Sequence, residues 1–126
     1  MILVDTDILI DVSRNIDIAI NRLDLEEKTN QISISVITEM ELIVGCRNKL
    51  ELQHINKFLS RYDISQINDN ISIFTVELIK TYRLSHGLLM PDAFIAATSI
   101  INNFPLLTKN QSDYRFISGI NLLPYP

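Results

Sequence analysis

The chain has 126 residues, of which 47% are hydrophobic and 21% charged, and its formal net charge is −4 at pH 7. Such a chain is too apolar to be disordered and long enough to bury a core, so we expect a single domain over residues 1–126. The acidic balance argues against an indiscriminate nucleic-acid binder, which depends on Lys and Arg, but allows a site that reaches phosphate through metal ions.

Cysteine usage and the N-terminus narrow the class further. Cys46 is the only cysteine, which excludes an intrachain disulfide and a zinc site built from several thiolates. The apolar run over residues 2–4 follows no basic segment and is far too short for a signal peptide or a membrane span. We therefore expect a soluble cytoplasmic protein without membrane contact.

The apolar run Ile2-Leu3-Val4 is followed at once by the carboxylate of Asp5. Consecutive apolar residues are typical of a strand buried on both faces, as in a parallel sheet covered by helices. Asp5 would then stand at the carboxyl end of that strand, the edge where open α/β sheets bind ligands. Other acidic residues that reach this edge are candidates for a shared site.

Hydrophobic periodicity and turn residues predict the remaining elements. The first half of the chain should contain a helical turn over 7–12, a helix over 16–25, a strand over 31–35 and a helix that Ser35 or Thr38 caps and Gly45 ends. The second half should contain a helix over 48–61, a strand over 64–67, a long helix capped by Asp69 or Asn70 and ending at His86-Gly87, a buried helix from Pro91 through 93–101, a strand over 105–108 and a possible fifth strand over 120–123. Strands that alternate with helices predict a layered α/β/α sandwich with a mostly parallel sheet of four to five strands.

Each candidate acid also has a purely structural interpretation. Asp5 can cap the helix that follows it, and Asp113 can be an N-cap after the fourth strand. Glu41 forms Thr-x-x-Glu with Thr38, the pattern of a capping box. Asp92 lies in the first turn of its helix, where a carboxylate complements the helix dipole.

The positions of the acids together favour a shared site. Glu41 lies near the start of its helix, and we prefer it to Glu39, which points about 200° away at ~100° per residue. Asp92 opens the most apolar helix, where a carboxylate needs a partner or a cation. Carboxylates within ~4 Å repel by about 4 kcal/mol per pair at an effective dielectric near 20, and a hard divalent cation removes that repulsion. Oxygen ligands without His or Cys favour Mg²⁺ or Mn²⁺.

Four ordered segments resemble the PIN-domain nucleases, most closely the VapC-type toxins of bacterial toxin–antitoxin pairs. These segments are Leu3–Ile10, Ile34–Gly45, Pro91–Ala97 and Leu107–Tyr114, and they span almost the whole chain. The resemblance implies that the acidic core and its Mg²⁺ or Mn²⁺ ligands are Asp5, Glu41 and Asp92, with Asp113 as a fourth member. It implies as supporting polar residues Thr6, Thr108 and Asn110.

Two positions depart from similar sequences. Asp7 stands where they often carry Asn, and Glu39 adds a second acid beside Glu41. We interpret Asp7 as a cap or supporting residue, and the sequence leaves open whether Asp7 or Glu39 joins the site.

The resemblance implies a metal-dependent endoribonuclease, in which the acids hold one or two ions that orient and deprotonate water for attack on an RNA phosphodiester. It also implies a homodimer and a cognate antitoxin protein as partner. Two alternatives stay open. One is a non-catalytic binding or regulatory module with an acidic pocket. The other is a phosphatase similar to the haloacid dehalogenases, with Asp5 as nucleophile and Asp7 as acid, although no later Asp-Asp pair exists.

Overall fold

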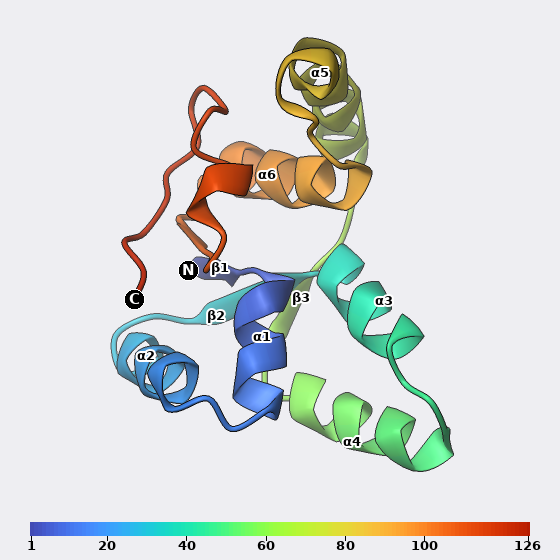
Figure 1. Cartoon of the computed structure of the whole chain (residues 1–126), viewed down its shortest axis with the longest axis vertical. Coiled ribbons are helices and arrows are strands. Elements are labelled where there is room, and N and C mark those ends of the chain that lie inside the picture. Colours follow the sequence, from blue (N-terminus) through green and yellow to red (C-terminus); the bar gives the residue numbers. More distant parts are fainter.

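A computed structural model describes residues 1–126, in which strands and helices alternate along the chain (Figure 1). The elements are β1 (Ile2–Val4), α1 (Thr6–Ser13), α2 (Asp17–Glu27), β2 (Ile32–Ser35), α3 (Val36–Val44), α4 (Lys49–Leu59), β3 (Asp63–Ser65), α5 (Asp69–His86), α6 (Met90–Asn102), β4 (Leu106–Leu107) and the short 3-10 helix η1 (Gln111–Asp113).

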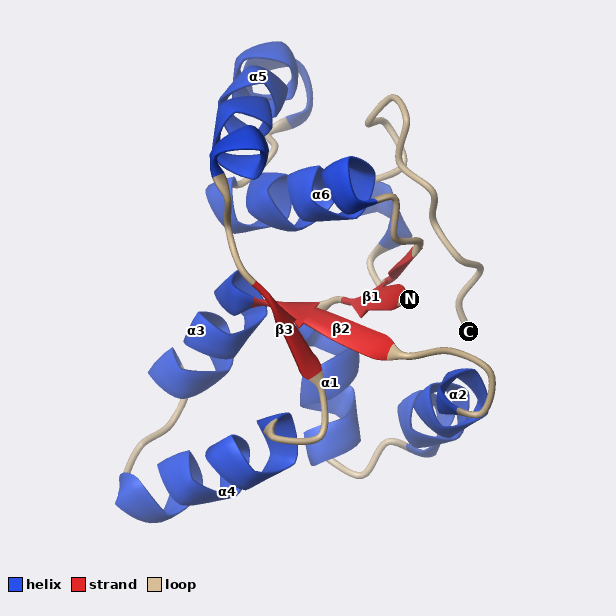
Figure 2. Ribbon diagram, turned by 180° about the vertical axis from the view of Figure 1, so that it is seen from behind, coloured by secondary structure: helices blue, strands red, loops and turns tan.

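The four strands form one sheet in the order β3-β2-β1-β4, and every neighbouring pair is parallel. Figure 2 shows the strands crossing the middle of the molecule, with α5 and α6 on one side and α1, α2 and α4 on the other. This arrangement confirms the expected layered α/β/α sandwich.

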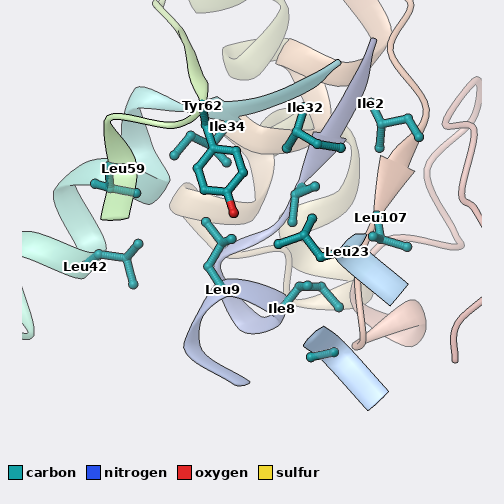
Figure 3. Packing of buried hydrophobic residues seen from close by; sticks show 12 residues of the cluster. Ile2, Ile8, Leu9, Leu23, Ile32, Ile34, Leu42, Leu59, Tyr62 and Leu107 are labelled. Atoms are coloured by element: carbon teal, nitrogen blue, oxygen red, sulfur yellow. The ribbon is translucent and has the colours of Figure 1, made fainter. Parts of the chain in front are cut away.

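Alternation along the strands supplies a core to each face of the sheet. Ile2 and Val4 pack with residues of α1, α2 and α4 in one cluster (Figure 3), whereas Leu3 between them packs with residues of α5 and α6 in the other. β4 divides in the same way, because Leu107 joins the first cluster and Leu106 the second. The consecutive apolar residues of β1 are therefore explained by a strand covered on both faces.

Three sequence expectations about boundaries need correction. The expected fifth strand is reduced to a single parallel bridge between Leu106 and Leu122. The third strand begins at Asp63 rather than Ile64 and ends at Ser65. The long helix is capped by Asn68, whose side chain accepts a hydrogen bond from the Ile71 amide, and not by Asp69 or Asn70.

The expected capping box of α3 is also absent. Ser35 is the N-cap, and its hydroxyl accepts a hydrogen bond from the amide of Ile37 at 3.1 Å. Thr38 lies inside the helix, so its hydroxyl and the carboxylate of Glu41 are free for partners outside α3.

None of the helices combines the length and the apolar character that crossing a bilayer would require.

Candidate active site

The strand order reverses at β1. From β1 the chain proceeds to β2 and β3 on one side and later returns to place β4 on the other side. In open α/β sheets ligands bind where the strand order reverses in this way. Asp5 directly follows β1 and Thr108 directly follows β4, so both side chains lie at this point.

Asp5 is almost fully buried, with 6% of its surface exposed. Its Oδ1 accepts a hydrogen bond from the Thr6 amide at 2.8 Å, which caps α1, and its Oδ2 accepts one from the Thr108 hydroxyl at 2.8 Å. Burial, followed by the nearby negative charge of Asp7, raises the pKa of Asp5 to about 7. Asp5 therefore combines the capping role with an energetically costly buried charge.

Asp7, in the first turn of α1, is hydrogen-bonded to the loop after β4. Its Oδ2 accepts hydrogen bonds from the backbone amides of Lys109 and Asn110, each at 3.0 Å, and lies 3.2 Å from the Thr108 hydroxyl oxygen. Its Oδ1 is buried and has no hydrogen-bond partner. Burial raises the pKa of Asp7 as well. The contact that Asn110 makes here comes from its backbone.

A pair of threonines connects Glu41 to the end of β1. The Thr6 hydroxyl lies 2.7 Å from Oε1 of Glu41 and 2.9 Å from the Thr38 hydroxyl. Because a hydroxyl has a single hydrogen, Thr6 donates to the carboxylate and accepts from Thr38. This hydrogen bond holds the Glu41 carboxylate beside Thr6, the residue that follows Asp5.

Asp92, in the first turn of α6, meets a buried tyrosine. The Tyr114 hydroxyl donates to Oδ1 of Asp92 at 3.2 Å, and the tyrosine has no exposed surface. The pKa of Asp92 is raised to about 6, chiefly by burial and further by the charges of Asp113, Glu41 and Asp7, while the Tyr114 hydrogen bond opposes the rise. Proximity to Asp5 and Asp92, after burial, raises the pKa of Tyr114 far above its ordinary value.

Sequence reasoning missed Tyr114, although it directly follows Asp113 in the last of the family-like segments. Asp113 itself ends η1 and is exposed, and its charge reaches Asp92. The structure thus brings all four predicted acids to one end of the sheet, with Asp7 among them. Glu39 makes no hydrogen bond to this group.

In their present rotamers no three of the His, Cys, Asp and Glu side chains are placed to hold one metal ion. The donor set nevertheless fits a hard divalent cation. It consists of carboxylate and hydroxyl oxygens, the repulsion between Asp5 and Asp7 raises the pKa of Asp5, and one buried oxygen of Asp7 lacks a partner. A divalent cation would offset both the repulsion and the unsatisfied oxygen.

Comparison with known proteins identifies a family. The family model described as PIN domain matches residues 2–117. Ribonuclease VapC1 of Methanocaldococcus jannaschii is 33% identical over 126 residues, covering 98% of this chain and 86% of that protein. Ribonuclease VapC10 of Mycobacterium tuberculosis is 32% identical over 111 residues, covering 87% of this chain and 83% of the relative.

Solved structures give the same result. The chain resembles one in the crystal structure of VapBC2 from Rickettsia felis bound to a DNA fragment from the promoter, with a TM-score of 0.84 and 28% identity over the full length of both chains. It also resembles one in a toxin–antitoxin complex from Klebsiella pneumoniae, with a TM-score of 0.78 and 34% identity over 95% of each chain.

Proposed function

Because this chain belongs to the PIN domain family, we propose that it is a metal-dependent endoribonuclease and the toxin of a toxin–antitoxin pair. Relatives that are named ribonucleases and match nearly the whole chain support RNA as the substrate. Similarity to chains from toxin–antitoxin complexes supports a cognate antitoxin protein as partner. The observation that carries the nuclease proposal is the meeting of Asp5, Glu41 and Asp92 at the switch point of the sheet.

Four carboxylates would hold the divalent cation, Mg²⁺ or Mn²⁺. These are Asp5, Glu41, Asp92 and Asp113, which lie directly after β1, in α3, in α6 and in η1 in turn. When bound, the ion supplies Lewis acidity that activates water and neutralises charge on the phosphodiester.

The chain's own residues orient these ligands. Thr6 fixes the rotamer of Glu41, and Thr108 does the same for Asp5. The Asn110 amide anchors the loop after β4 through Asp7. Asp92, with a pKa near 6, is ionised at neutral pH and is the candidate acceptor for the proton of the attacking water.

The experiment compares purified wild-type protein with Asp5→Asn on single-stranded and structured RNA, with and without Mn²⁺. The proposal expects Mn²⁺-dependent cleavage by the wild type and its loss in the variant. Equal cleavage by both proteins would refute the proposed nuclease site. Metal that stabilises the fold without any RNA cleavage would favour the non-catalytic module instead, and an aspartyl-phosphate trapped on Asp5 would favour the phosphatase.

Three further features belong to the same proposal. We infer a single domain over residues 1–126, since both core clusters pack on one sheet. We also infer a homodimer, and action in the cytoplasm, where RNA substrates are found. Co-expression with a candidate antitoxin, followed by size-exclusion chromatography, tests the partner.

A further inference from the structure

The two oxygens of Asp7 are in opposite situations. Oδ2 accepts hydrogen bonds from the amides of Lys109 and Asn110 and lies 3.2 Å from the hydroxyl oxygen of Thr108, whose single hydrogen is donated to Asp5. Oδ1 is shielded from solvent and has no partner. The contacts of Oδ2 fix the carboxylate, so Oδ1 is held in one place by the loop after β4.

An oxygen in this situation needs an explanation. Leaving a buried acceptor unpaired costs about 1–3 kcal/mol, and more for a charged group. Protonation does not remove the cost, because a proton on Oδ1 would be a donor that also lacks a partner. No basic side chain compensates, since the ammonium of the adjacent Lys109 is bonded at 2.9 Å to Asp11, one helical turn further along α1.

The surroundings of Asp7 contain further carboxylates rather than cations. Its negative charge raises the pKa of Asp5 at the end of β1 and that of Asp92 in α6. Asp7 therefore lies near two of the proposed metal ligands, which come from different elements. A divalent cation among these groups would satisfy Oδ1 and neutralise the repulsion in one step.

We propose that Asp7 is a further metal ligand of this site, with Oδ1 bound to the divalent cation while Oδ2 stays bonded to the loop after β4. This inference rests on the proposed metal-dependent function. It assigns Asp7 two roles at once, since the same carboxylate that joins α1 to β4 also pre-positions an oxygen for the cation.

The variant Asp7→Asn separates these roles. The amide oxygen of asparagine can accept the two backbone hydrogen bonds of Oδ2, which leaves its NH₂ group, a donor unable to bind a cation, in the place of Oδ1. Asp11→Asn is the matched control, because it removes one negative charge from the same helix at a residue already paired with Lys109.

Electron paramagnetic resonance of Mn²⁺ gives a readout independent of cleavage. Titrations yield the affinity, and line broadening in ¹⁷O-water yields the number of water molecules on the ion. We expect Asp7→Asn to weaken Mn²⁺ binding by at least about tenfold and to add one bound water, with a thermal unfolding midpoint close to that of the wild type. Asp11→Asn should leave the water number unchanged and the affinity within about threefold of the wild type.

An unchanged water number in a folded Asp7→Asn protein that still binds Mn²⁺ would overturn the inference and leave Asp7 as a loop anchor, with the nuclease proposal intact. Wild-type protein that binds no Mn²⁺ would overturn both the inference about Asp7 and the proposal of a metal-dependent nuclease. Should the variant fail to fold, a wild-type crystal grown with Mn²⁺ decides, since the inference requires an anomalous peak about 2.1–2.2 Å from Oδ1 of Asp7.

Discussion

The carboxylates at the end of the sheet are destabilised by the same burial that positions them. The pKa of Asp5 is raised to about 7 and that of Asp92 to about 6, chiefly by desolvation. An unfolded aspartate ionises near pH 4, so between about pH 4 and pH 7 the folded protein holds protons that the unfolded chain has released. The contribution of Asp5 and Asp92 to the free energy of unfolding is thus greatest at low pH and falls as the pH rises to 7.

We therefore expect the free energy of unfolding of the metal-free protein to decrease from pH 5 to pH 8. Each unit of elevated pKa is worth about 1.4 kcal/mol, so the decrease should be on the order of a few kcal/mol, mostly from Asp5 because Asp92 is only half-buried. Urea unfolding with a chelator present measures it. Asp5→Asn, uncharged at every pH, should lose most of the dependence, and Mn²⁺ should restore stability at pH 8. A free energy that increases with pH would contradict the argument.

The hydroxyl of Thr6 is the only hydrogen-bond donor to the Glu41 carboxylate in the structure. Thr6→Val keeps the shape of the side chain and frees the carboxylate, so we expect RNA cleavage to fall roughly tenfold with a stability loss of about 1 kcal/mol. Thr75→Val is the matched control, since it removes a buried hydroxyl that bonds within α5 to the Ile71 carbonyl. It should cost similar stability and leave cleavage unchanged. Equal cleavage by Thr6→Val and wild type would show that Glu41 needs no such positioning.

At the scale of the elements, two glycines end helices in different ways. Gly87 closes α5 with a φ of +71°, in the left-handed region, whereas Gly45 closes α3 with a φ of −73°. A Cβ at Gly87 would meet nothing within 4 Å, and one at Gly45 would meet only carbonyl oxygens at 3.6 Å. Backbone conformation alone therefore distinguishes the two positions.

Alanine substitutions at the two glycines should shift stability in opposite directions. Gly87→Ala should destabilise the protein by about 1–2 kcal/mol, the cost of a left-handed residue with a Cβ. Gly45→Ala should stabilise it by about 0.4–1 kcal/mol by restricting the unfolded chain. Chemical denaturation measures both changes, and shifts of the same sign would refute the argument.

At the scale of the whole molecule, features set by residues close in the sequence could be predicted, whereas contacts between distant segments could not. The consecutive apolar residues before Asp5 predicted a doubly covered strand because burial on both faces leaves a local trace in sequence. The cap at Asn68 and the lost fifth strand were missed because neighbouring residues offer equivalent caps and a single bridge has no periodicity. The role of Asp7 depends on β4 lying beside β1, a contact between segments about a hundred residues apart that no local pattern contains. The hydrogen bond from Tyr114 to Asp92 likewise joins residues that are not neighbours in the sequence.

The proposed homodimer would need apolar side chains that the protein's own core leaves exposed. On α5 these include Ile73, Val76 and Leu84, the last being 99% exposed. Residues 73, 76 and 84 recur at helical spacing and so share one face of the helix. Such a face is typical of a surface that another protein chain covers. In the proposed homodimer, a second copy of this chain would cover it.

Leu84→Lys tests this assignment because it changes a side chain without intramolecular packing, so the fold should be unaffected. If α5 forms the dimer contact, the variant should be monomeric at concentrations where the wild type is dimeric. Burial of a leucine side chain contributes roughly 1.5–3 kcal/mol. In a two-fold symmetric dimer the substitution removes this contribution from both subunits. Light scattering coupled to size-exclusion chromatography measures the mass, with Leu25→Lys, the same substitution at an exposed leucine of α2, as control. A dimer that persists in Leu84→Lys would place the contact elsewhere, since each subunit would otherwise bury an unpaired lysine charge at the interface.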